Sequence, residues 1–339
     1  MTQDRLIAVA LMAVVAVAVT VVLWQGHDQS APRGGRGLEP DLEVPAQLIA
    51  YDEIVEASFA IAMRPGHDLA VDGQGRVAVA GGDGVRVFGP DGRPVRHLLA
   101  GEEVFAVAWG DQGQRLYLAT RDQVQVFTEA DTPVWSWPPP RERAFLLSLA
   151  VADDAVFVSD NGDHPRAIIW HLDRDGVVQG QFGMATADYD GLKVATVDPR
   201  HFMALTLLPE GGDLIVANQG RLRLERFARD GRLQALIGGP AGARSFTDHA
   251  AFVGCCNPIA LAVLADGGLV TAEKGSRFAR VKVLESDGSL RCYVAPPAVF
   301  GGRKLGPMAL AVDSAGRILL IDERQWTVRV FAPRAGSRP

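Results

Sequence analysis

The sequence has few cysteines, no excess of basic charge and little helical patterning beyond its first residues. Only three of its 339 residues are cysteine, namely Cys255, Cys256 and Cys292. A small disulfide-stapled scaffold has a larger and even number, so this fold must depend on its hydrophobic core. The 34 Lys and Arg against 40 Asp and Glu give a net charge of -6. Because nucleic-acid-binding proteins normally carry a basic face, this balance argues against a nucleic-acid partner.

One long apolar run lies near the N-terminus, where residues 6–24 read LIAVALMAVVAVAVTVVLW. As a helix this run spans roughly 30 Å, the thickness of a bilayer core. A cleavable signal peptide is the alternative, but its apolar stretch is usually about 7–15 residues, followed by a small-residue cleavage site. The sequence therefore predicts a transmembrane signal anchor within residues 1–24.

The positive charges on the two sides of the run are nearly balanced, since Arg5 precedes it and Arg33 and Arg36 follow it. The positive-inside rule therefore hardly favours either orientation of the anchor. Short N-terminal anchors commonly export the chain that follows. We therefore expect a single-pass protein of the cell inner membrane with its body on the extracytoplasmic, periplasmic side. Residues 25–45 contain APRGGRGLEPDLEVP and are predicted to form a flexible linker.

From residue 64 onward the sequence repeats at intervals of roughly 30 to 50 residues, as propeller blades do. The clearest unit, residues 67–99, has four short apolar runs divided by Asp-Gly, Gly-Gly and Gly-Pro turns. The last unit, residues 308–331, repeats the first three runs. Four further units lie between them, at 105–137, 147–183, 203–238 and 259–294. This pattern predicts an all-β, six-bladed β-propeller over residues 46–333, with 334–339 as a tail.

The last unit lacks a fourth strand, whereas a strand-like segment, residues 47–59 (QLIAYDEIVEASF), precedes the first unit. We expect this segment to supply the missing outer strand, so that the two ends of the chain close one ring. Closure also hides the sheet edges that a linear array exposes.

The segments AVDGQGRVAVA, residues 70–80, and AVDSAGRILLID, residues 311–322, carry an Asp-x-x-Gly turn between two apolar runs. In these segments the chain resembles the NHL repeat family. Units two and three depart from this turn. The resemblance implies a propeller used most often for binding, with enzymes as a minority.

Two long insertions, residues 184–201 and 239–256, each follow a predicted fourth strand. In a four-stranded antiparallel blade, connections that leave the fourth strand share a face with the turns between the second and third strands. Both insertions are therefore expected on one face, around the mouth of the central channel. Elaborated loops on a rigid scaffold often carry function, so this face is the candidate site.

The second insertion ends in GCCNP, residues 254–258, and the same unit carries TAEKG, residues 271–275. This combination is similar to one in a group of uncharacterised bacterial NHL-like propellers, a resemblance that implies no activity. The topology is expected to bring both segments together. The candidate binding residues here are Cys255, Cys256, Asn257, Glu273 and Lys274.

Adjacent cysteines allow several kinds of chemistry. Consecutive Cα atoms are about 3.8 Å apart, whereas disulfides prefer about 4.4–6.8 Å, so a Cys255–Cys256 bridge is strained and easily reduced. The reduced pair offers two thiolate ligands to copper(I) or zinc, and Lys274 favours thiolates by its charge. The alternatives are simple packing or a rigid structural disulfide. Cys292 is expected to be a packed strand residue.

A further set of aligned residues ends the predicted second strands, namely Gly81, Thr120, Asp160, Asn218, Glu273 and Asp322. One interpretation is that each side chain hydrogen-bonds the turn that follows it. The other is that Asp160, Asn218, Glu273 and Asp322 point into the channel and hold a metal cation through oxygen ligands. Propeller lactonases and lyases resemble this second design but add specific His or Glu ligands at strand starts. His67 is the one comparable histidine, and its HDLAVDG segment is too generic to indicate catalysis.

The leading hypothesis is a binding or scaffold propeller that presents the candidate face to a protein partner. The vicinal cysteines favour a membrane or periplasmic redox complex. The rival hypothesis is a propeller enzyme, either a metal-dependent lactonase or lyase or a thiol-disulfide catalyst at Cys255 and Cys256. No cofactor is indicated beyond a metal ion in the channel or a soft metal at these cysteines.

Overall fold

The computed structural model describes residues 43–139, 141–194, 203–209, 212–238, 248–254, 256–275, 279–301, 309–322 and 324–336. The predicted anchor and almost all of the predicted linker lie outside these residues. Within the described part of the chain, no helix combines the length and the apolar character needed to cross a bilayer.

The strands form six antiparallel sheets, each made from one of the predicted repeat units. Blade 1 contains β3 (Gly66–Val71), β4 (Val77–Gly81), β5 (Gly84–Phe88) and β6 (Pro94–Leu98), and blade 2 contains β7 (Ala106–Gly110), β8 (Arg115–Ala119), β9 (Val124–Phe127) and β10 (Pro133–Trp137). Blade 3 contains β11 (Leu146–Val151), β12 (Ala155–Asp160), β13 (Ile168–Asp173) and β14 (Val178–Phe182), and blade 4 contains β15 (Leu205–Leu207), β16 (Leu214–Asn218), β17 (Arg223–Phe227) and β18 (Leu233–Ile237). Blade 5 contains β19 (Ala260–Val263), β20 (Leu269–Glu273), β21 (Arg280–Leu284) and β22 (Leu290–Ala295), and blade 6 contains β23 (Leu310–Val312), β24 (Ile318–Asp322) and β25 (Thr327–Pro333).

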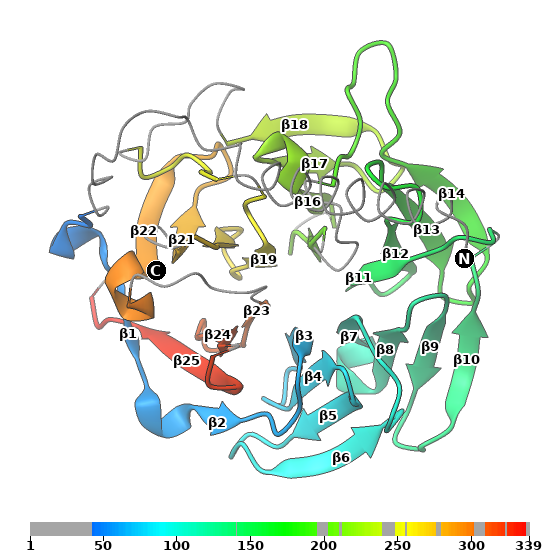
Figure 1. Ribbon diagram of the computed structural model, residues 1–339, viewed down its shortest axis with the longest axis horizontal. Coiled ribbons are helices and arrows are strands. Elements are labelled where there is room, and N and C mark those ends of the chain that lie inside the picture. Colours follow the sequence, from blue (N-terminus) through cyan, green and yellow to red (C-terminus); the bar gives the residue numbers. More distant parts are fainter. Residues whose placement is uncertain are drawn as a thin grey trace, which may run out of the picture. The chain divides into compact units, whose positions relative to one another are not determined.

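The first strands of the blades form a closed inner ring. Each of β3, β7, β11, β15, β19 and β23 contacts the next, and β23 contacts β3 (Figure 1). The hydrophobic core lies between neighbouring sheets, where Ala78 and Ala80 of blade 1, for example, pack with Leu116 and Leu118 of blade 2. The predicted all-β, six-bladed propeller is therefore confirmed.

Residues 47–59 lie beside the last blade, as the sequence predicts, but they form two short strands instead of one. Strand β1 (Tyr51–Glu53) pairs with the end of β25, β2 (Phe59–Ala60) pairs with its start, and a 3-10 turn, η2 (Val55–Ala57), separates them. Just before β1, the Ala50 amide donates to the Tyr293 carbonyl of β22 at 3.0 Å. The entering chain therefore bridges blades 5 and 6 and completes the ring.

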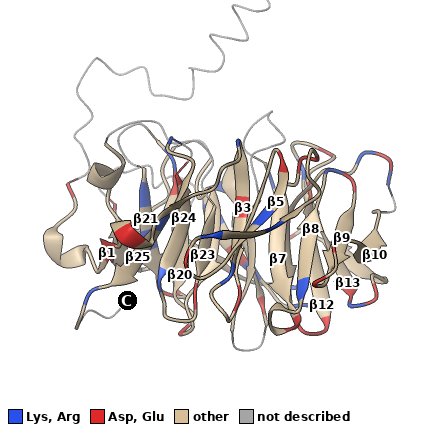
Figure 2. Ribbon diagram, turned by 90° about the horizontal axis from the view of Figure 1, so that it is seen from below, with Lys and Arg blue, Asp and Glu red and all other residues tan. Residues whose placement is uncertain are grey.

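The repeated Asp-x-x-Gly sequence has a direct structural cause. Asp72 Oδ1 accepts hydrogen bonds from the Gln74 and Arg76 amides, while its Oδ2 accepts one from Arg76 Nε at 2.6 Å. Asp313 does the same with Ala315 and Arg317 in blade 6. Charged residues lie in many of the connections at the two ends of the sheets, and also within strands such as β3, β5 and β21 (Figure 2).

Ring closure gives the first testable prediction. Glu53 of β1 forms a two-pronged ion pair with Arg329 of β25, at 2.8 and 2.6 Å. Because both side chains are largely buried, Glu53→Gln should lower the free energy of unfolding by about 1–2 kcal/mol in urea denaturation of the full chain. The neighbouring Asp52 pairs with Arg334 at the exposed surface. Asp52→Asn should therefore change stability by less than about 0.5 kcal/mol. Equal effects of the two variants would contradict this closure.

Candidate functional site

The described parts of both insertions lie at the same end of the sheets. In the first insertion, the Lys193 amide donates to Asn218 Oδ1 at 3.1 Å, at the end of β16. In the second, Asn257 Oδ1 accepts from the Lys274 amide, and its Nδ2 donates to the Lys274 carbonyl, both at 2.9 Å, beyond the end of β20. Since β16 and β20 are both second strands, the two insertions share one face. We call this end of the sheets, with residues 184–194, 248–254 and 256–257, the insertion face.

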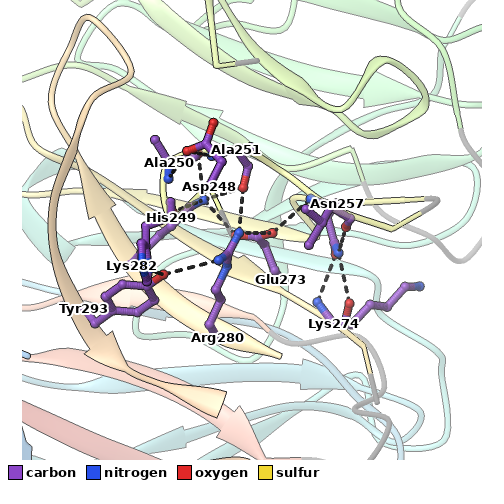
Figure 3. A network of polar contacts seen from close by, with 11 residues as sticks. Asp248, His249, Ala250, Ala251, Asn257, Glu273, Lys274, Arg280, Lys282 and Tyr293 are labelled. Carbon is purple, nitrogen blue, oxygen red and sulfur yellow. Dashed lines mark hydrogen bonds and ion pairs between the residues drawn. The ribbon is translucent and has the colours of Figure 1, made fainter. Parts of the chain in front are cut away.

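A fully buried ion cluster lies directly beneath the second insertion. Glu273 ends β20, and Arg280 and Lys282 lie two residues apart on β21, so both basic side chains project from the same side of the strand. Arg280 Nε lies 2.8 Å and Lys282 Nζ 2.9 Å from Glu273 Oε1, and all three side chains are 0% exposed. Figure 3 shows them converging under residues 248–251.

The same three side chains hold the insertion backbone in place. Lys282 Nζ donates to the carbonyl oxygens of residues 249, 250 and 251 at 3.2, 2.8 and 2.9 Å. Arg280 Nη2 also donates to the Ala251 carbonyl, at 2.6 Å, and Glu273 Oε2 accepts from the Val253 amide at 3.2 Å. The loop thus has its backbone hydrogen bonds supplied by buried charges instead of by another strand.

The charges of the cluster shift several pKa values. Burial alone raises the pKa of Glu273, but Lys282 and Arg280 outweigh it and hold that pKa below its usual range. Burial lowers the pKa of Lys282 to about 8 despite the attraction of Glu273. Burial, reinforced by Arg280, also lowers the pKa of His249, whose Nδ1 lies 2.8 Å from the Tyr293 hydroxyl. His249 is therefore neutral near pH 7, which avoids a third positive charge beside the cluster.

Blade 4 repeats this design around the first insertion. Glu225 of β17 is 0% exposed and accepts hydrogen bonds from Arg223 Nε at 2.6 Å and from Asn218 Nδ2 at 2.8 Å. The Tyr189 hydroxyl, from the insertion, also donates to Glu225. Glu225 pairs with Val216 just as Lys282 pairs with Thr271, so the two charged residues occupy equivalent positions in their blades.

Sequence reasoning missed these charged residues of the third strands. The signal was present, because RLERF and RVKVL place charged residues inside strands that are otherwise apolar. A charge in a strand packed between two sheets needs a buried partner, and the adjacent insertions supply one.

The other predicted strand-end residues bond locally. Asp160 accepts from the Phe145 and Gly162 amides and from Trp170 Nε1, at 3.0, 2.9 and 3.1 Å. Asp322 accepts from the Arg324 amide at 2.9 Å and lies 3.4 Å from Arg329 Nη1. None of the six aligned residues lines the channel cavity. Asp160 and Asp322 therefore hydrogen-bond the turn that follows them. Asn218 and Glu273 instead bond an insertion and the third strand of their own blade. Elsewhere in the described chain, no group of three His, Cys, Asp or Glu side chains is arranged to hold a metal.

The structure describes two of the three cysteines, Cys256 and Cys292. Cys255 lies outside the described residues, so the predicted vicinal pair stays a prediction. Cys256, in the second insertion, is buried. Cys292 packs in the core of blades 5 and 6, as expected, and burial raises the pKa of its thiol to about 11. A thiol in that setting is unreactive at neutral pH.

The central channel contains a cavity of about 310 Å³ lined by all six inner strands. His67 borders it, with Nε2 3.0 Å from Glu103 Oε1 and its ring stacked on Phe105. Next to it is Asp68, which sequence reasoning did not single out. Asp68 Oδ1 accepts from the Leu69 amide at 2.9 Å and Oδ2 from the Val107 amide of blade 2 at 3.0 Å. Burial raises the pKa of Asp68 to about 7.

Comparison with known proteins supports the fold. No model of a known protein family and no curated protein matches this sequence. A protein of unknown function from Bacteroides thetaiotaomicron has a TM-score of 0.59 and 13% identity, over 84% of this chain and 76% of that one. A streptogramin B lyase has a TM-score of 0.53 and 11% identity, over 84% and 97%. The WD40 β-propeller domain of Doa1 has a TM-score of 0.51 and 16% identity, over 84% and 98%.

These similarities support the β-propeller fold, and the six sheets of this chain make it a six-bladed β-propeller. At identities this low they show the fold alone. Membership of the NHL repeat family stays a prediction, since it rests on the turn sequences and on no family match.

The buried cluster gives the second prediction. Glu273→Gln leaves Arg280 and Lys282 buried without a counter-charge, so the full chain should lose about 3–5 kcal/mol of stability in urea denaturation. Lys274→Gln, on the same turn, alters a side chain that is partly exposed, and it should change stability by less than about 0.5 kcal/mol. A loss below about 1 kcal/mol for Glu273→Gln would show that the cluster does not hold the insertion.

Proposed function

We propose that this chain is a binding propeller that presents the insertion face to a protein partner. The observation that carries this proposal is the buried cluster of Glu273, Arg280 and Lys282. The three side chains are fully buried and form hydrogen bonds with the backbone of residues 249–253. They are therefore not available to a substrate. A loop held rigid in this way loses little conformational entropy on binding, which favours recognition of a partner.

The exposed side chains of the insertion face suit a protein surface. Met184 is 52% exposed, and Asp188 and Lys193 are also exposed on the first insertion. Methionine is enriched in protein interfaces, and charges of both signs at the rim of such a patch give specificity. The candidate residue Asn257 is buried, and its amide bonds the Lys274 backbone, so it holds the second insertion to the end of β20.

We further propose that residues 6–24 anchor the propeller to the inner membrane from its periplasmic side. The long apolar run supports this, since it is long enough to cross a bilayer core as a helix. The Cys255–Cys256 pair supports a partner in a membrane or periplasmic redox complex.

A second candidate is a propeller enzyme of the lactonase or lyase kind. His67 favours it, because this residue begins an inner strand and borders the channel cavity. Thiol-disulfide catalysis at Cys255 and Cys256 is the other enzymatic form of this candidate.

The anchor gives the third prediction. The full chain expressed in bacteria should resist carbonate extraction from membranes and keep its residues 2–24 by mass spectrometry. Two arginines in the apolar run, Val14→Arg with Val17→Arg, should release it, since each charge costs about 2.5–3.5 kcal/mol near the bilayer centre. Val55→Arg, at an exposed position of the body, should leave fractionation unchanged. A mature chain beginning after residue 24 would show a cleaved signal instead.

The insertion face gives the fourth prediction. Cross-linking in gently solubilised membranes should yield a defined partner of the full chain, identified by mass spectrometry. Met184→Asp should reduce its recovery at least tenfold, because it replaces the exposed apolar side chain of the face with a charge. Val134→Asp is the matched control, since Val134 is 55% exposed on the outer strand β10. Equal recovery with both variants would refute the proposed face, and loss with Cys255→Ser and Cys256→Ser would extend it to the cysteines.

A further inference from the structure

Two basic side chains of the insertion face lie directly opposite each other. Arg166, on the turn between β12 and β13, and Lys193, in the first insertion, form an isolated antiparallel bridge. Two backbone hydrogen bonds flank this pair, one on each side, at 2.8 and 3.4 Å. In such a pair the Cα atoms are about 4.5 Å apart, and the two side chains leave the backbone on the same side. Two like charges placed in this way repel each other.

No acidic side chain of the described chain neutralises this pair. Arg166 and Lys193 are both exposed, and neither forms an ion pair with a described residue. Asp163, on the same turn as Arg166, pairs with another arginine, and Asp190 of the insertion pairs with two others. Asp188 is exposed on the same insertion and forms no ion pair with either basic residue. The two positive charges are therefore available to a partner.

The basic side chains at the two ends of the sheets differ in their partners. In the described connections at the end opposite the insertion face, every Lys and Arg forms an ion pair, namely Arg76, Arg93, Arg174, Arg229, Arg232 and Arg317. On the insertion face, five basic residues besides Arg166 and Lys193 form none within the described chain, namely Arg64, Arg121, Arg143, Lys274 and Arg324. Unpaired acidic residues such as Asp122 also lie on this face, so its charge as a whole is mixed. The Arg166–Lys193 site, however, is locally positive.

We propose that Arg166 and Lys193 bind the carboxylate groups of an acidic segment on the protein partner. This inference rests on the function proposed for the insertion face and specifies the charge that the partner presents. The guanidinium group of Arg166 offers two parallel donors to a carboxylate, and the ammonium group of Lys193 places a second positive charge beside it. Exposed charges of this kind speed association and select the partner.

The surroundings of the pair favour a protein over a membrane surface or a nucleic acid. The Leu192 amide donates to the Gly183 carbonyl at 2.8 Å. Lys193 and the exposed Met184 each follow one of these two residues, so an acidic segment with an apolar side chain can engage both. Recognition of anionic lipid usually takes a cluster of about four to eight basic residues, and nucleic acid takes a basic stripe. This site has one facing pair.

A fluorescein-labelled peptide of ten glutamates is a suitable probe, with a peptide of ten glutamines as its neutral counterpart. Fluorescence anisotropy with the purified full chain in neutral detergent should show saturable binding of the glutamate peptide at about 50 mM sodium chloride. Binding should weaken at least tenfold at about 300 mM, because salt screens exposed charges. The glutamine peptide should not bind. Displacement by dihexanoyl phosphatidylglycerol at a lower concentration than by the unlabelled glutamate peptide would overturn the proposal in favour of a lipid headgroup site.

The matched variants are Arg166→Gln with Lys193→Gln and, at the opposite end of the sheets, Arg93→Gln with Arg232→Gln, where both arginines are also exposed. The first double variant should bind the glutamate peptide at least tenfold more weakly, and the second should bind it as the wild type does. The urea midpoint of the first double variant should not fall, because the substitutions remove a repulsion. A loss of binding then cannot be a loss of folding.

Absence of binding by the wild type, or equal binding by the wild type and the first double variant, would overturn this proposal. The insertion face itself is tested separately by cross-linking. A partner that is lost with Met184→Asp but kept with the first double variant would confirm the face and refute only the acidic segment.

Discussion

The structure depends on the closure of the ring by the first strands of the body. Each blade buries both faces of its sheet against its neighbours, so a gap at any one place exposes apolar surface on two sheets. The chain closes the gap by laying β1 and β2 along β25 and by bonding residue 50 to β22. The channel cavity and the insertion face both exist only while the six inner strands hold this circle.

Buried charge has a special role on the insertion face. An apolar core of similar volume is often as stable as a buried ion pair, or more so. Apolar side chains, however, leave the polar backbone of an irregular loop unsatisfied. Lys282 and Arg280 solve this for the second insertion by donating to its carbonyl oxygens, and Glu225 accepts from Tyr189 to hold the first. The same positions in two blades thus serve two different loops.

The sequence predicts the fold well because the turns and the apolar runs repeat. The Asp72 and Asp313 turns have the same hydrogen bonds, and the orphan segment at 47–59 lies where the missing strand is needed. The site is predicted only in outline. Topology correctly brings Asn257 beside Lys274. Whether Glu273 points to the channel or away from it depends on sheet twist and on its partners on β21, which spacing alone does not reveal. The position of Asp68 was not predicted for another reason. HDLAVDG is a common strand pattern, and it does not indicate that this carboxyl group borders the channel cavity.

Closure of the ring is best tested by native-state hydrogen exchange of the full chain in low denaturant. If β1, β2 and β25 complete a single cooperative ring, the slowest amides of β25 should open with the same free energy as those of β8 and β12. The slowest amides of all three strands should then exchange only when the whole domain unfolds. If blade 6 opens at a free energy several kcal/mol lower while the amides of the other blades stay protected, the N-terminal strands do not close the ring.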